Sequence, residues 1–176
     1  DTDVLVFNNE LNKCFGGSED FLISKDYNFI DTKRDYSEFN KISETTCSMF
    51  WATVFYFKKT KFNEMFFDLI EHIKENWHFY RLVYEISETK FRNDYAFSIA
   101  IHTLRGMKEA TWPLCIPASM WITIDKDVLL SIDDTKLTML LHKEYDYQGS
   151  VIRDANVHIM NKFSLERCIN EVFENE

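Results

Sequence analysis

The segment between residues 49 and 80 limits the possible folds of this chain more than any other feature. MFWATVFYF (49–57) is dense in aromatic and β-branched residues and predicts a buried strand. Directly after it, apolar side chains recur at helical spacing from Phe62 to Tyr80, which predicts an amphipathic helix that Thr60 or Asn63 can cap. A buried strand leading into an amphipathic helix favours an α/β or α+β architecture.

Weaker patterns extend this order along the chain. Low counts of glycine (4) and proline (2) favour long regular elements, and 176 residues suit a single domain spanning 1–176. A polar turn region is expected at 8–20 and a surface loop at 31–46. The remaining expected elements are a buried strand at Val4–Phe7, a short strand within 21–31, a helix from Asn93 to a stop at Gly106, strands within 114–125 and 136–142, a strand or loop at 150–163, and a closing helix at 164–174 that Ser164 can cap.

Charge and composition argue against some classes of function. The net charge of −9 argues against a general nucleic-acid binder, since such proteins present a basic surface. No run approaches the roughly 20 apolar residues of a membrane-spanning helix. The four cysteines lie far apart without a C-x-x-C pair, which is typical of buried reduced thiols in a cytoplasmic protein.

Asp1 and Asp3 form a D-x-D pair at the start of the chain. Side chains alternate along an extended segment, so both carboxylates face the same side. Carboxylate oxygens in this arrangement suit a hard cation such as Mn²⁺ or Mg²⁺. Surface turns carry the same pattern by chance, so a solvated chain end is the competing interpretation.

Two further segments carry side chains suited to chemistry. NVHIMNK places His158, a possible ligand in a mixed nitrogen and oxygen site for Mn²⁺, four residues before Lys162, a possible phosphate partner. FRNDYAF places Asn93 and Asp94 at a helix start, where they can bind sugar hydroxyls or supply a general base. Structural histidine and lysine side chains, and ordinary helix caps, are the alternatives.

Taken together, DTDVLVF, FWATVFYF, the 62–80 helix, FRNDYAF and VHIMNKFSL resemble, in order, the segments of GT-A fold glycosyltransferases, including the glycogenin-like family. VHIMNKFSL is also similar to glycosyltransferase-like proteins of large phages. The resemblance implies an α/β fold with a GT-A-like mixed sheet and flanking helices. It also implies that an N-terminal nucleotide-binding part is missing, two or three βα units of roughly 30 residues each.

The same resemblance implies the site. Asp3 and His158 would hold Mn²⁺ or Mg²⁺, with Asp1 binding directly or through water. The donor would be a nucleotide-diphosphate sugar, expected to be UDP-linked, whose phosphates Lys162 would contact. The acceptor can be a glycan, a protein or a modified nucleobase. Localisation would be cytoplasmic, or in the host cytoplasm for a viral protein.

Roles on the sugar side follow from the resemblance as well. Asn93 and Asp94 would face the sugar, with Asp94 as the base if the enzyme inverts the anomeric centre. Trp51 and Thr53 stand where the family's F-N-x-G-V strand has Asn and Gly, so the donor sugar and the activity stay open. Trp51 is either a binding surface or part of the core.

Two alternatives remain open. One is an inactive relative that binds a nucleotide sugar or serves as a scaffold. The other is a divalent-metal-dependent phosphatase-type hydrolase, with Asp1 as the nucleophile and Lys136 and the Asp133-Asp134 pair in support.

Overall fold

The computed structural model describes residues 3–25, 28–30, 41–43, 46–105, 114–118 and 120–173. The chain is a mixed α/β protein in which these residues form three small sheets and several helices. It divides into two compact units, each with its own apolar core. The β-rich unit comprises Asp1–Lys13, Tyr27–Arg34 and Ala118–Glu176, and the helical unit comprises Cys14–Asp26 and Asp35–Pro117. One domain over 1–176 stays a prediction, because two compact units can belong to one domain.

The β-rich unit contains a mixed sheet built from segments far apart in the sequence. Its strand order is β1 (Val4–Val6), β10 (Asn156–His158), β6 (Met120–Ile122) and β3 (Asn28–Phe29). β1 runs antiparallel to β10, whereas β10 and β3 run parallel to β6. The first strand of the chain therefore pairs with a strand close to its last helix.

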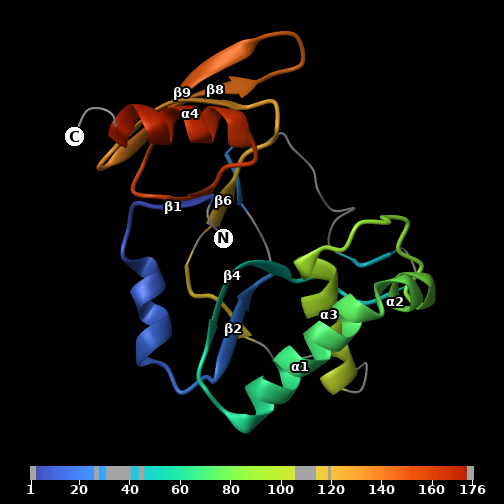
Figure 1. Ribbon diagram of the computed structural model, residues 1–176. Coiled ribbons are helices and arrows are strands. Elements are labelled where there is room, and N and C mark those ends of the chain that lie inside the picture. The colour runs from blue at the N-terminus through green and yellow to red at the C-terminus, as the bar shows by residue number, and fades with distance from the viewer. Residues whose placement is uncertain are drawn as a thin grey trace. The chain divides into compact units, whose positions relative to one another are not determined.

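A second sheet of this unit is an antiparallel meander of β7 (Val128–Asp133), β8 (Lys136–His142) and β9 (Tyr147–Arg153). Along β8, Leu137, Met139 and Leu141 are buried and alternate with half-buried residues, as the period of two requires. Helix α4 (Lys162–Phe173) packs against β7 and adds Leu165 to the same core (Figure 1).

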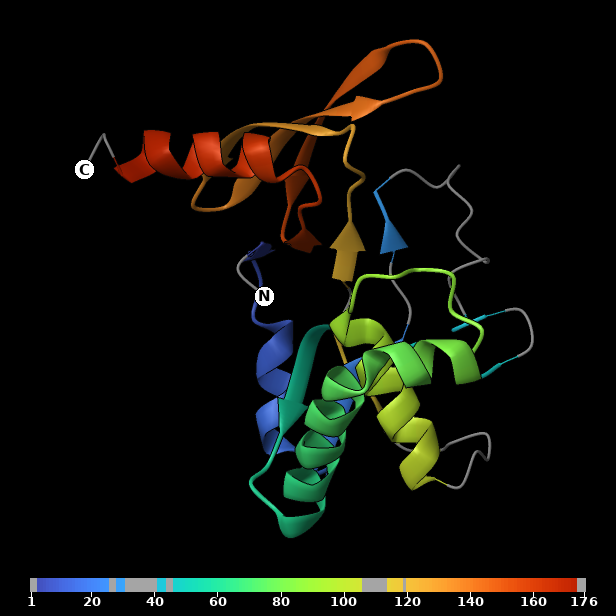
Figure 2. The same ribbon diagram turned by 45° about the vertical axis from the view of Figure 1, so that its right-hand side comes forward.

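The helical unit has a three-stranded sheet of β4 (Trp51–Phe57), β2 (Phe21–Ser24) and β5 (Leu114–Cys115), with β2 in the middle. Its helices are α1 (Lys61–Glu75), α2 (Trp77–Val83) and α3 (Asn93–Leu104), and α1 packs beside α3 (Figure 2). Phe21, Phe66 and Phe97 pack edge to face at centroid distances of 4.8 and 5.5 Å. The abundant phenylalanine thus fills this core.

The strand and helix predicted within 49–80 are confirmed, with one break. Thr60 is the N-cap of α1, and its side chain accepts a hydrogen bond from the Asn63 amide. The predicted continuous helix to Tyr80 is wrong at Asn76, where α1 ends and α2 begins. The Asn76 side chain donates to the carbonyl of His72 at 2.9 Å, a local bond that competes with regular helix geometry.

Several other expectations need correction. The strands at 4–7 and 49–57 are predicted to be buried, but among the described residues β1 and β4 are edge strands of their sheets. Val6 is therefore 54% exposed and Phe57 48% exposed. The polar region at 8–20 contains a 3₁₀ helix, η1 (Glu10–Gly16). Sequence patterns missed β7. The cap of α4 is Asn161, not Ser164, because the Asn161 side chain accepts from the Ser164 amide at 3.1 Å.

Other predicted features are confirmed or lie outside the description. The short strand within 21–31, the strands within 114–125 and 136–142 and the helix starting at Asn93 are confirmed. Gly106 and most of the predicted loop at 31–46 lie outside the described residues. No helix in the described part of the chain is long and apolar enough to span a membrane.

Candidate metal and diphosphate site

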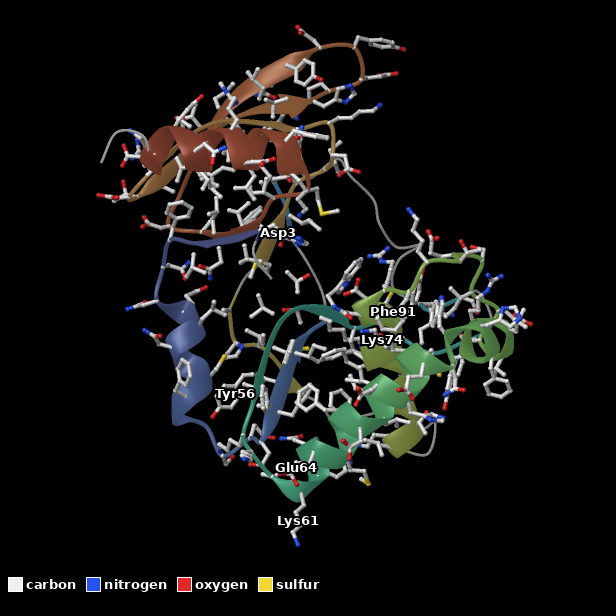
Figure 3. The ribbon with its side chains drawn as sticks, viewed as in Figure 1. Asp3, Tyr56, Lys61, Glu64, Lys74 and Phe91 are labelled. Atoms are coloured by element: carbon white, nitrogen blue, oxygen red, sulfur yellow. The ribbon has the colours of Figure 1, made fainter. Side chains whose placement is uncertain are left out.

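The pairing of β1 with β10 brings Asp3 next to His158. Val4 lies opposite His158 in the register, and one residue further the Ile159 amide donates to the Asp3 carbonyl at 2.9 Å. The side chains meet as well, because Asp3 Oδ2 lies 3.3 Å from His158 Nε2. Asp3, labelled in Figure 3, is 8% exposed and His158 is 9% exposed, so the pair is largely removed from water.

Lys162 completes this group from the first turn of α4. Its ammonium contacts Oδ2 of Asp3, the same oxygen that faces His158, and donates to the carbonyl of Ile159 at 2.7 Å. The cap by Asn161 fixes the backbone here, since it binds the amide of Ser164. The structure therefore brings together three of the residues proposed from sequence, namely Asp3, His158 and Lys162.

Thr123, which sequence analysis did not identify, holds the histidine segment in place. Its backbone amide donates to the His158 carbonyl at 3.1 Å, and its side-chain oxygen accepts from the Met160 amide at 2.8 Å. Thr123 is 1% exposed and directly follows β6, the parallel neighbour of β10. A threonine after a buried strand is too common a signal to have revealed this role.

The atoms of Asp3 and His158 fit a divalent cation in two respects. A carboxylate oxygen and an imidazole nitrogen form a donor set that Mn²⁺ accepts. Their separation of 3.3 Å is close to the roughly 3 Å between neighbouring ligands that each lie about 2.1 Å from one ion. In addition, Oδ1 of Asp3 is buried and has no hydrogen-bond partner among the described residues.

The third predicted ligand, Asp1, lies outside the described residues. Within the described ranges, no group of three histidine, cysteine or acidic side chains is placed to hold a metal ion. The described residues therefore bring together two donor groups suited to a cation, those of Asp3 and His158, and the ammonium of Lys162 lies against the Asp3 carboxylate.

The charge of Lys162 is subject to opposing influences. Burial lowers the pKa of its ammonium. Contact with the Asp3 carboxylate favours the charged form and acts in the opposite direction. With its side chain 53% exposed, we expect the carboxylate to dominate and Lys162 to be protonated at neutral pH.

Asp94 and Asn93, predicted to face a sugar, belong to the helical unit. The Asp94 carboxylate accepts from the Ala52 amide through Oδ1 and from Arg92 through Oδ2, both at 2.9 Å. It thereby ties the start of α3 to β4. Asn93 is exposed and is the first residue of α3, and the preceding residue, Arg92, is the N-cap. These contacts give Asp94 a structural role, and its catalytic role stays a prediction.

Trp51 and Thr53 lie on β4, also in the helical unit. Trp51 is half-buried and pairs with Ser24 of β2, whereas Thr53 is 7% exposed. A binding role for Trp51 stays a prediction.

The residues considered for a hydrolase lie at the turn between β7 and β8. Asp133 pairs with Lys136 across the strands, with Oδ2 and Nζ 3.6 Å apart. Their side chains are 52% and 35% exposed, as expected for a hairpin turn in contact with water. Nothing in this arrangement concentrates charge as a buried catalytic site does.

No protein family, curated protein or solved structure matches this chain.

Proposed function

We propose that this chain carries the metal and diphosphate site of a GT-A-like glycosyltransferase, which transfers a sugar from a nucleotide-diphosphate donor. One observation carries the proposal. Asp3 of the D-x-D segment lies against both His158 and Lys162, although Asp3 and Lys162 are 159 positions apart in the sequence. The resemblance to this enzyme class requires these three side chains in one place.

Each of the three side chains has a distinct role in the proposal. Asp3 and His158 hold the cation, which when bound supplies Lewis-acid stabilisation of a departing diphosphate. Lys162 contributes a positive charge to the diphosphate oxygens. The low exposure of Asp3 and His158 limits competition by water for the cation, and Thr123 holds the backbone on either side of Ile159 through the His158 carbonyl and the Met160 amide.

The local backbone architecture around Asp3 also supports the proposed cation and diphosphate site. Asp3 precedes a strand that pairs antiparallel with the histidine-bearing strand, within a mixed sheet. Helix α4 starts at Lys162, so the positive N-terminal end of the helix is the end that carries the lysine in contact with Asp3. A site that gathers a carboxylate, an imidazole, an ammonium and a helix N-terminus suits a complex of a cation with an anion.

The test is a calorimetric titration of UDP and of GDP, each with and without Mn²⁺, into the protein expressed from its natural start codon. We expect one of the two nucleotides to bind only with Mn²⁺ present. His158→Ala should weaken this binding at least about tenfold, a typical loss on removing an interaction with a bound metal. His78→Ala, which removes an exposed imidazole on α2, is the matched control and should bind as the parent does.

Absence of metal-dependent binding for both nucleotides would overturn the proposal. Equal weakening by His78→Ala and His158→Ala would also count against it, because the effect would not depend on the proposed ligand. If nucleotide binding requires the metal, the protein is next incubated with nucleotide sugars, and release of nucleoside diphosphate is measured. Release of inorganic phosphate in place of nucleoside diphosphate would identify a hydrolase.

A further inference from the structure

The ion pair between Lys162 and Asp3 has a consequence for how a cation enters the proposed site. The Lys162 ammonium contacts Oδ2 of Asp3, and this oxygen also lies 3.3 Å from Nε2 of His158. Oδ2 and Nε2 are the two atoms that fit a shared cation. A divalent ion bound between them would face a second positive charge on the same carboxylate oxygen. The ammonium and the cation therefore compete for Asp3.

Of these groups, the ammonium is the one free to move. Asp3 and His158 belong to paired backbone, held by the hydrogen bond from Ile159 to Asp3 and by that from Thr123 to His158. Both side chains are only 11% exposed. The Lys162 side chain is 53% exposed on a flexible stem, although its backbone is fixed at the start of α4. Displacement of the ammonium by a cation therefore leaves the rest of the site in place.

A diphosphate changes the outcome of this competition. Its oxygens offer the displaced ammonium a new anionic partner, so the loss of the ion pair with Asp3 is offset. A free cation offers no such partner. Binding of the cation and of the diphosphate should thus strengthen each other, and by thermodynamic linkage the coupling is reciprocal.

We infer that Lys162 makes the site selective for a cation bound to a diphosphate over the free cation. This inference rests on the proposed function, since it concerns the same site. It assigns to Lys162 a specificity role in addition to a contact with phosphate, namely to suppress binding of the metal alone.

The test compares the affinity for Mn²⁺ alone with the affinity at saturating UDP, in the parent chain and in Lys162→Met. Free Mn²⁺ is measured by electron paramagnetic resonance, which requires no enzymatic activity, and the Mn²⁺ bound by UDP or pyrophosphate in protein-free mixtures is subtracted. Inorganic pyrophosphate replaces UDP in a parallel series, so that recognition of the diphosphate is separated from that of the nucleoside. Lys126→Met, which removes an exposed lysine between β6 and β7 of the same unit, is the matched control.

In the parent and in Lys126→Met, UDP or pyrophosphate should tighten Mn²⁺ binding by about tenfold or more, within the usual range of coupling between sites. In Lys162→Met, Mn²⁺ alone should bind more tightly, and added diphosphate should tighten it by less than about threefold. Thermal unfolding of each variant verifies the fold, and Lys162→Gln repeats the experiment with a polar side chain.

Two results separate the failure of this inference from that of the proposed function. If the parent binds Mn²⁺ with UDP but Lys162→Met and Lys162→Gln keep the parent's coupling, the inference is wrong and the proposed function stands. If no form of the chain binds Mn²⁺, with or without a diphosphate, both are wrong.

Discussion

Asp94 offers a quantitative test of how the helical unit is held together. Its carboxylate accepts hydrogen bonds from the Ala52 amide and from the Arg92 guanidinium, each at 2.9 Å. The Asp94 side chain is 15% exposed, whereas that of Arg92 is 42% exposed. As the second residue of α3, Asp94 also places a negative charge at the positive end of the helix.

The expected cost of removing this carboxylate follows from its three contacts. Without the carboxylate, the partly buried Ala52 amide has no hydrogen-bond acceptor, which costs about 1–1.5 kcal/mol. This value is in the lower part of the range for a buried hydrogen-bond donor left without a partner. Loss of the charge at the helix start adds about 0.3–1 kcal/mol. The pair with the exposed Arg92 adds at most about 0.5 kcal/mol, because solvent screens it. Asp94→Ala should therefore lower the free energy of unfolding by about 1.3–3 kcal/mol.

The assay is urea denaturation followed by tryptophan fluorescence, which reports on this unit through Trp77, a buried residue stacked on Tyr95 of α3. Asp94→Asn keeps an oxygen for the Ala52 amide, so its loss should be only about 1 kcal/mol. Arg92→Met, the control for the ion pair, should change stability by less than about 0.5 kcal/mol. A loss below about 0.5 kcal/mol for Asp94→Ala, or equal losses for Asp94→Ala and Asp94→Asn, would refute the reasoning.

Two further predictions concern the helix cap and the thiols. Thr60→Ala should lower the free energy of unfolding by about 1 kcal/mol in the same assay, because the Asn63 amide loses the hydroxyl oxygen that it donates to at 3.2 Å. Thr60→Ser keeps this oxygen and should change the free energy of unfolding by less than about 0.5 kcal/mol. Equal losses for the two variants would contradict the capping role of Thr60. In labelling with a thiol reagent at pH 8, followed by peptide mass spectrometry, the exposed Cys115 should react before Cys14 and Cys168. Burial raises the pKa of those two thiols, so their reactive thiolate fraction is low at pH 8 and increases as the pH rises; faster labelling of Cys168 than of Cys115 would disprove this order.

Local elements followed well from sequence wherever the pattern was long or chemically specific. The helix after residue 60 has repeating apolar positions and a threonine cap, and both depend on neighbours a few residues away. The break at Asn76 was missed because it arises from one side chain bonding the backbone of the preceding turn. The burial of β1 and β4 was overestimated, because composition does not show whether a strand lies in the middle of a sheet or at its margin.

The candidate site depended on a different kind of information. D-x-D, His158 and Lys162 are each weak signals, and only a family resemblance linked them before the structure was considered. Their proximity comes from the antiparallel pairing of β1 with β10, which joins opposite ends of the chain. No informative sequence pattern indicated the hydrogen bond from the Met160 amide to Thr123 or the contact of Lys162 with Asp3.

By itself, then, the sequence determined the α/β class, the principal helices and the side chains that could bind a cation, because periodicity, capping and donor chemistry are properties of residues and their near neighbours. Only the tertiary structure decided that Asp3 shares one oxygen between His158 and Lys162, and that Asp94 binds the backbone of β4. Such contacts depend on the register of strands and the packing of helices, which bring together residues that no local pattern connects.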